Sequence, residues 1–152
     1  MQLRDFEEKD REACRVLLDS LGDWFGIAAS NREYIASLGK LPSAVVIDHG
    51  GIVGFTAIET HNRQSMELLV IAVSESYHRQ GVGSMLLGWV EDHCVAKNAP
   101  WLHVKTRGPL TPDPGYERTR QFYLGQGFTP LFETLDLWGP QDAALIMVKK
   151  LT

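Results

Sequence analysis

The sequence predicts a single α+β domain over residues 1–152, with a mixed, mostly antiparallel sheet of six to seven strands flanked by about four helices. Residues 66–73, MELLVIAV, are nearly all apolar, which is typical of a central strand buried on both faces. A helix pattern and a further strand at 101–106 follow, and this order implies a parallel pair of strands. Short β-branched segments joined by tight turns favour antiparallel pairing elsewhere.

The chain begins with a short strand, expected at 2–6, and an amphipathic helix, expected at 10–21. The predicted buried face of this helix comprises Ala13, Cys14, Val16, Leu17, Leu18 and Leu21. An aromatic loop, Asp23-Trp24-Phe25-Gly26, leads to a second short helix at 31–38, which Gly39 closes. The rings of the loop either pack against the core or line a substrate pocket.

Two apolar, β-branched segments at 43–48 and 52–59 are separated by His49-Gly50-Gly51, which predicts a tight hairpin. A polar turn at 61–64 then leads to the central strand. Glu67 is the one charged residue of that strand.

The longest predicted helix lies within residues 74–97 and follows a glycine-rich turn. Its apolar residues recur at three- and four-residue steps, the period at which a helix buries one face. They are Val82, Met85, Leu86, Trp89, Val90 and Cys94. The first two turns contain no acidic residue before Glu91, although acidic side chains usually neutralise the positive end of a helix.

Gly81 and Gly83, at the start of this helix, allow the backbone to approach a ligand closely. Successive N–H groups in such a turn form an anion site, which predicts a bound phosphate or pyrophosphate, with Arg79 adding a charge. The alternative is a plain strand-to-helix turn with Arg79 in solvent. The turn lacks the Gly-Lys-Ser/Thr ending of a P-loop and the third glycine of a dinucleotide fingerprint.

The last third of the chain opens with the strand at 101–106 and a loop at 107–115 whose three prolines indicate a non-helical segment. A helix is expected at 117–126, where Gly127 caps it. The closing strands are expected at 128–137 and 143–150, around a turn at 136–140.

Composition limits the classes of function. The net charge is −4, and no run of Lys or Arg occurs, which argues against nucleic acid as a partner and mildly favours cationic substrates. The N-terminus resembles neither a signal nor a transit peptide, and no apolar run approaches membrane-spanning length. We therefore expect a cytoplasmic protein without membrane contact. Cys14 and Cys94 form no C-x-x-C pair and are expected to be buried thiols.

The ordered series MELLVIAV, HRQGVGSMLL, a parallel strand and RTRQFYLGQGF resembles the GNAT (GCN5-related N-acetyltransferase) superfamily of acyl-CoA-dependent enzymes. In that family a Gln/Arg-x-x-Gly-x-Gly/Ala turn holds the pyrophosphate of coenzyme A. A Phe-Tyr pair followed by Gly-Phe marks a helix whose tyrosine faces the thioester sulfur. Gly81 and Gly83 match the turn, and Tyr123 and Gly127-Phe128 match the helix. The resemblance covers about residues 1–150 in element order.

The resemblance implies acetyl-CoA as co-substrate. His78 occupies the place that Gln or Arg usually holds, and Tyr116 stands where many members carry an Asn that contacts pantetheine. Backbone N–H groups at 71–73 match those that bind pantetheine and polarise the acetyl carbonyl, often at a β-bulge. The implied cofactor-binding residues are Ile71, Ala72, Val73, His78, Arg79, Gln80, Gly81, Val82, Gly83, Ser84 and Tyr116.

The resemblance also implies two catalytic side chains. Glu67 matches the glutamate that in some members accepts the amine's proton, directly or through water, and we expect burial to raise its pKa. Tyr123 matches the acid that protonates the thiolate. The alternatives are a glutamate at a solvated strand end and an ordinary core tyrosine.

The other histidines, His49, His61, His93 and His103, are expected to be surface or packing residues. Among the minor candidates for a second base, His103 and Lys105 are the better placed, because they alternate on the strand beside the central one.

The implied function is transfer of an acetyl group from acetyl-CoA to a primary amine within a ternary complex. Two alternatives remain: a non-catalytic acyl-CoA sensor or interaction module, and a nucleotide-binding module that uses the same turn. The acceptor, a small molecule or a peptide, and a homodimer are left open by the sequence. No metal is implied.

Overall fold

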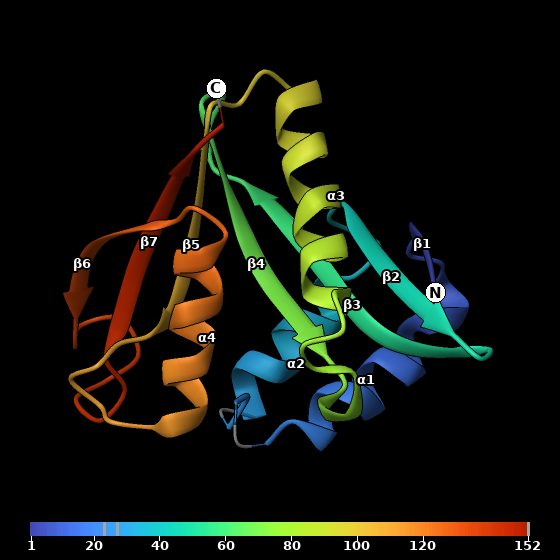
Figure 1. Cartoon of the computed structure of the whole chain (residues 1–152), viewed down its shortest axis with the longest axis horizontal. Helices are drawn as coiled ribbons and strands as arrows, with labels where there is room; N and C mark the ends of the chain where they lie inside the picture. The colour runs from blue at the N-terminus through green and yellow to red at the C-terminus, as the bar shows by residue number, and fades with distance from the viewer. Residues whose placement is uncertain (23, 27, 152) are drawn as a thin grey trace. The chain divides into compact units, whose positions relative to one another are not determined.

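The computed structural model describes residues 1–22, 24–26 and 28–151. Within these residues, seven strands form a mixed sheet in the order β1-β2-β3-β4-β5-β7-β6, accompanied by four α-helices (Figure 1). The strands are β1 (Gln2–Asp5), β2 (Ser43–Asp48), β3 (Gly51–Thr60), β4 (Ser65–Val73), β5 (Trp101–Arg107), β6 (Thr129–Thr134) and β7 (Ala144–Lys150). The helices are α1 (Arg11–Ser20), α2 (Ala28–Ser37), α3 (Val82–Ala96) and α4 (Pro114–Gly125). The predicted fold class is confirmed.

The chain divides into two compact units. The first unit comprises residues 1–59 and 68–93, and the second comprises residues 60–67 and 94–152. Strand β4 and helix α3 each contribute residues to both. A single domain over 1–152 stays a prediction.

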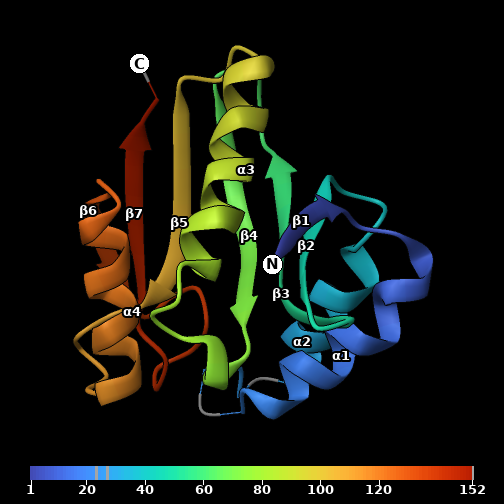
Figure 2. The ribbon, with the colours of Figure 1, turned by 45° about the vertical axis from the view of Figure 1, so that its right-hand side comes forward.

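The sheet of the first unit is covered on both faces. On one face, α1 packs with side chains of β2, β3 and β4, including Val45, Phe55 and Val70. On the other face, Val46 and Val53 pack against Val82 and Leu86 of α3. Successive side chains of a strand point to opposite faces, so the two clusters alternate along the same strands. Figure 2 shows α3 running along β4.

Helix α1 buries a narrower face than the sequence pattern predicts. The buried residues of α1 are Cys14, Leu17 and Leu18, and Leu21, directly after the helix, is buried as well. Ala13 and Val16 are exposed, so their predicted burial is wrong. The buried set follows the i, i+3, i+4, i+7 spacing of one helix face, and Val16 lies off that stripe.

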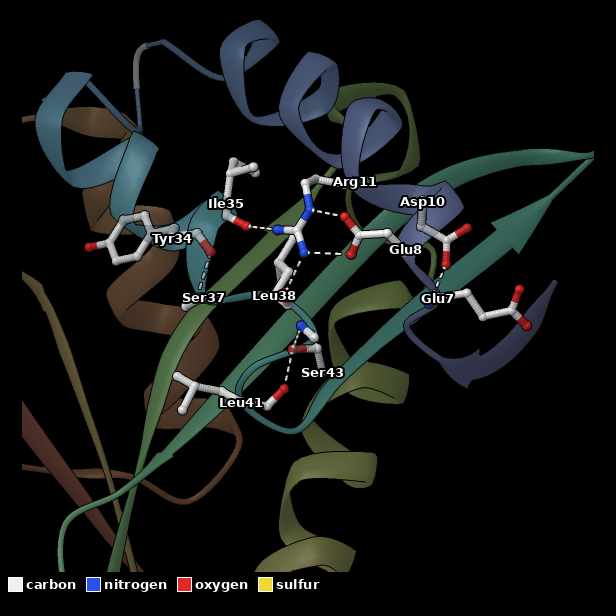
Figure 3. Close-up of polar contacts among 11 residues, drawn as sticks. Glu7, Glu8, Asp10, Arg11, Tyr34, Ile35, Ser37, Leu38, Leu41 and Ser43 are labelled. Atoms are coloured by element: carbon white, nitrogen blue, oxygen red, sulfur yellow. Dashed lines mark hydrogen bonds and ion pairs between the residues drawn. The ribbon is translucent and has the colours of Figure 1, made fainter.

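Helix α2 is fixed to α1 by the guanidinium group of Arg11 (Figure 3). Its Nη2 donates to the Leu38 carbonyl at 2.7 Å, and its Nη1 donates to the Ile35 carbonyl. Both carbonyls lie at the C-terminal end of α2, where backbone oxygens lack partners within the helix. Glu8 holds the same guanidinium from the other side, at 2.7 Å. Helix α2 begins three residues before its predicted start.

A salt bridge between Arg4 and Asp10 stabilises the start of α1. Arg4 donates to Asp10 through its two terminal nitrogens, Nη1 at 2.8 Å and Nη2 at 2.9 Å, and the Glu7 backbone N–H donates to the same carboxylate at 2.8 Å. Asp10 is buried. The hydrogen bond from Arg4 outweighs burial and lowers the pKa of Asp10.

The hairpin between β2 and β3 turns through two residues only. His49 and Gly50 have φ values of 49° and 77°, the left-handed pair that a two-residue hairpin turn requires. Gly51 pairs with Asp48 and belongs to β3, so its predicted place in the turn is wrong. Further along β3, a Cβ on Gly54 would lie 2.8 Å from Val82 Cγ1, so glycine there allows α3 to pack closely.

The aromatic loop falls partly on described residues. Asp23 lies outside them. Trp24 and Phe25 are half-buried and pack against the core cluster around α1, and the Phe25 ring meets Tyr34 edge-on at 6.3 Å. These contacts support the packing interpretation of the loop.

In the second unit, the first residues of β4 run parallel to β5, as predicted, with Glu67 opposite His103. Strands β5, β7 and β6 pair antiparallel. Helix α4 begins at Pro114, three residues before its predicted start, so the last residues of the loop are helical. Asp113 caps the helix by accepting from Gly115 N at 2.9 Å, and proline suits the first helical position.

The closing strands are shorter than predicted, because residues 135–143 form turns and bends. Leu131 interrupts the pairing of β6 with β7, where the register shifts between Pro130 and Phe132.

Both cysteines are buried and reduced, as expected.

Candidate functional site

The turn between β4 and α3, in the first unit, combines two left-handed residues with a helix start that has no acidic side chain. A short 3-10 turn at Glu75–Tyr77 leads into Arg79 and Gly81, whose φ values are 63° and 87°. Met85 N donates to Gly81 O at 3.0 Å, which begins the helix. No acidic residue occurs in the first turn of α3, all of which the structure describes. No carboxylate of the helix itself therefore neutralises the partial positive charge of the N–H groups in this first turn.

Three exposed side chains line the turn, and two of them also bond to its backbone. His78 Nε2 lies 2.9 Å from the Val73 carbonyl, to which it donates, and its ring meets Trp24 edge-on at 5.4 Å. Gln80 donates to the Ser76 carbonyl at 2.9 Å. Arg79 is exposed. The hydrogen bonds of His78 and Gln80 to backbone carbonyls of the same segment stabilise the conformation of the turn.

The remaining predicted cofactor residues of the first unit lie on the adjoining segments. Ala72 and Val82 are buried, which leaves only their backbone groups available to a ligand. Ile71 and Val73 are half-buried and pack with the α3 cluster. Gly83 and Ser84 occupy the first turn of α3. The β-bulge expected at 71–73 stays a prediction.

A polar cluster in the second unit surrounds Glu67. Its Oε1 lies 2.7 Å from His61 Nε2, 3.3 Å from Lys105 Nζ and 3.6 Å from His103 Nε2. The Glu67 side chain is only 4% exposed, whereas the His61 side chain is 40% exposed. A solvated strand end is therefore excluded for Glu67. The cluster combines a buried carboxylate with a ring that solvent reaches.

The expectation that burial raises the pKa of Glu67 is wrong. Burial alone does push this pKa upward, because it disfavours the charged form. The nearby His103 ring, the hydrogen bond with His61 and the charge of Lys105 outweigh it and lower the pKa to about 2. The sequence shows only the apolar neighbours of Glu67 in β4. The groups that reverse the shift come from the adjacent turn and from β5.

The two predicted tyrosines belong to α4. Tyr123 is buried, and its ring meets Phe122 and Phe128 edge-on, each at 5.4 Å between centroids. Tyr116 is half-buried in the first turn of the helix, and the guanidinium of Arg107 lies 5.4 Å above its ring. Burial among aromatic rings is compatible with either role of Tyr123, so its assignment as an acid stays a prediction.

The sequence also matches a known protein family. Residues 41–130, more than half of the chain, match the model of the acetyltransferase (GNAT) domain. The chain belongs to the GNAT family. The matched range includes the glycine-rich turn, the Glu67 cluster and Tyr123.

Solved structures with the GNAT fold agree with this assignment. A GNAT-family protein from Desulfovibrio desulfuricans superposes with a TM-score of 0.83 at 18% identity, over 99% of each chain. An aminoglycoside 6'-N-acetyltransferase in complex with coenzyme A has a TM-score of 0.80 at 15% identity, over 100% of this chain and 98% of the other. The ribosomal-protein-S18-alanine N-acetyltransferase of Escherichia coli has a TM-score of 0.79 at 17% identity, over 99% and 94%. At these identities the likeness concerns the fold. No match was found among curated proteins.

Two further observations concern other parts of the described chain. A hollow of about 490 Å³ in the first unit is lined by Asp5, Phe6, Gly39, Leu41, Pro42, Ser43, Trp89, Asp92 and His93. None of these was predicted as a site residue. Among the described residues, no helix combines the length and the apolar character needed to cross a bilayer.

Sequence reasoning missed the importance of His61. The sequence pattern groups it with the surface or packing histidines, although among the described side chains that contact Glu67 it lies nearest, at 2.7 Å. A signal was present in the sequence, because His61 opens the short polar turn at 61–64 and Glu67 is the second residue of the predicted strand that follows it. Residues on either side of such a turn come close in space.

Proposed function

We propose that this GNAT chain is an N-acetyltransferase that moves the acetyl group of acetyl-CoA to a primary amine by direct attack in a ternary complex. The observation that carries the proposal is the buried carboxylate of Glu67, which lies on the central strand of a GNAT fold and is paired with His61. His61, whose ring solvent reaches, lies 2.7 Å from this carboxylate. Such a pair offers an acceptor for the proton that an attacking amine releases.

The turn from His78 to Ser84 would hold the pyrophosphate of coenzyme A. Support comes from its left-handed backbone at Arg79 and Gly81 and from the absence of an acidic side chain in the first turn of α3. Backbone N–H groups at 71–73 would bind pantetheine and polarise the acetyl carbonyl, with Tyr116 as a further contact to pantetheine.

In the proposed reaction, the amine nitrogen attacks the thioester carbonyl carbon, so a C–N bond forms and the C–S bond breaks. The amine's proton passes to Glu67, directly or through water. Tyr123 gives its phenolic proton to the departing thiolate. An alkyl ammonium has a pKa of about 10.4 and a thiol one of about 8.5, so both proton transfers help at neutral pH.

The acceptor would be a small molecule or a peptide amine. The excess of 19 acidic over 15 basic residues mildly favours a cationic acceptor. Names of structural neighbours specify an aminoglycoside in one case and an alanine of a ribosomal protein in another. The proposal extends to the class of primary amines.

The test is to measure coenzyme A release over a panel of amines, alongside calorimetric binding of acetyl-CoA. We expect binding and amine-dependent release. Binding without release for any amine would favour the non-catalytic acyl-CoA sensor, and competition by ATP or NAD would favour a nucleotide-binding module.

A further inference from the structure

The cluster around Glu67 contains three donors of the kind that bind transition metals. The nitrogens of His61 and His103 and a carboxylate oxygen of Glu67 all lie within 4.8 Å of one another. We propose that these three side chains form a binding site for a divalent transition metal, with Zn²⁺ as the preferred ion. The binding claim stands apart from the proposed acetyl transfer.

The distances fit a tetrahedral ion after small movements. Zn²⁺ binds histidine nitrogen and carboxylate oxygen at about 2.0–2.2 Å, which places neighbouring ligand atoms roughly 3.3 Å apart. Glu67 Oε1 and His103 Nε2 are already 3.6 Å apart. Glu67 Oε1 and His61 Nε2, now 2.7 Å apart, have to separate by about half an ångström. Once its Nε2 proton moves to Nδ1, each imidazole presents a lone pair to the ion.

The backbone holds two of the ligands rigidly. Glu67 and His103 are paired residues of β4 and β5, so their side chains project from neighbouring strands at the same level. His61 lies in the turn before β4, which Asn62 orders by accepting from Gln64 N at 2.8 Å and Ser65 N at 3.0 Å. The His61 and His103 rings are 5.2 Å apart. The site is thus largely formed before an ion arrives.

Lys105 lies beside the carboxylate that would bind the ion. Its ammonium lies 3.3 Å from Oε1, and its side chain is 31% exposed. The flexible side chain can therefore turn towards solvent when the ion binds. Its charge still opposes binding, which predicts that removing it increases metal affinity.

Two imidazoles and one carboxylate favour zinc and its transition-metal neighbours over Mg²⁺ or Ca²⁺, which prefer all-oxygen sites. Three protein ligands leave a fourth position open to water or an amine. If the proposed transfer reaction is correct, Zn²⁺ would inhibit it, because a carboxylate bound to metal no longer accepts the amine's proton.

The test titrates the full chain, carrying no histidine tag, with Zn²⁺ against a chromophoric chelator, and with Co²⁺ while its visible absorption is recorded. No coenzyme or amine is present, so failure of the proposed function does not affect the result. We expect one ion per chain and a tetrahedral Co²⁺ spectrum. His61→Ala and His103→Ala should each weaken binding by at least roughly tenfold. Lys105→Gln should tighten binding by roughly tenfold.

His49→Ala is the matched control. His49 is exposed and lies 3.6 Å from Asp48, so it offers an incidental histidine and carboxylate pair outside the cluster. We expect this variant to bind as the unaltered chain does. Equal loss in His49→Ala, or unchanged binding in both His61→Ala and His103→Ala, would overturn the proposal. A Lys105→Gln variant that gains no affinity would also contradict it, and this variant is independent of whether the histidine variants fold.

Discussion

Glu67 and His61 form a pair in which a buried carboxylate lies 2.7 Å from a ring that is 40% exposed. The pair connects the interior of the second unit to solvent through a single hydrogen bond. Because the pKa of Glu67 is lowered to about 2, its carboxylate is ionised throughout the neutral range. A base of this low pKa is always ready to accept a proton but binds it weakly.

We expect Glu67→Gln to lower kcat/KM by roughly 10²–10⁴-fold at neutral pH, and the low pKa places the effect towards the lower end. The loss should shrink at high pH, where more of the amine is already neutral. Steady-state kinetics across pH check this. An unchanged pH–rate profile in a folded variant would leave Glu67 without a catalytic role.

Tyr123→Phe removes only a hydroxyl from a ring packed between Phe122 and Phe128, so the fold should tolerate it. A thiolate leaves tolerably without help, and we therefore expect a loss on the order of 10²-fold in kcat with little change in acetyl-CoA affinity. Tyr34→Phe, in the first unit, is the matched control and should leave kcat unaltered. If affinity falls together with kcat, the hydroxyl serves binding instead.

Gly83→Asp introduces a carboxylate into the first turn of α3. An acidic residue there suits the helix dipole, so thermal stability should be kept or raised. Acetyl-CoA binding should be lost, because the carboxylate repels the pyrophosphate. Calorimetry on Gly83→Asp and on Gly88→Asp, further along the same helix where a Cβ meets nothing within 4 Å, separates the anion site from a general effect of charge. Native affinity in Gly83→Asp would remove the pyrophosphate assignment.

Arg11→Met deprives two carbonyls at the end of α2 of a charged donor. We expect the free energy of unfolding to fall by about 2–3 kcal/mol, as for loss of hydrogen bonds to a charged group. Arg15→Met, four residues later in α1, breaks only the exposed pairs with Glu12 and Asp19 and should cost under about 1 kcal/mol. Urea denaturation measures both, and equal losses would show that the contacts with α2 add nothing.

Stability should fall on acidification between about pH 4.5 and pH 2. The pKa of Glu67 drops from 4.5 to about 2 on folding, and that of Asp10 is also lowered. In this range the unfolded chain binds more protons than the folded chain, so the stabilisation is present above the unfolded pKa and is lost as the pH falls. For Glu67 the contribution is on the order of 3 kcal/mol. Glu67→Gln should show a correspondingly shallower loss, and an identical slope would contradict the lowered pKa.

Elements with a clear period were predictable from the sequence. The central strand and the long helix were predictable from the spacing of their apolar residues, because that spacing reflects the period of the element itself and not its distant neighbours. The predicted start of α4 is three residues late because the prolines of the segment 107–115 indicate a loop, although Asp113 and Pro114 form a suitable helix start.

The environment of Glu67 was not predictable in the same way. Its sequence neighbours in β4 are apolar and suggest a raised pKa, whereas the groups that control it are His61, His103 and Lys105. Two of these come from β5, more than thirty residues later, and reach Glu67 only through the register of the parallel pair. The pKa of a buried group depends on the charged and hydrogen-bonding groups that such strand pairing brings near it, and a local sequence pattern does not show them.

The two buried cysteines provide a way to follow the opening of each unit. Cys14 belongs to the first unit and Cys94 to the second, and neither is exposed. Burial raises the pKa of Cys14 to about 12, so this thiol is protonated and sheltered in the folded chain. A thiol reagent can then label each cysteine only during transient exposure. Labelling rates of the single variants Cys14→Ala and Cys94→Ala therefore report the local opening free energies of the two units separately.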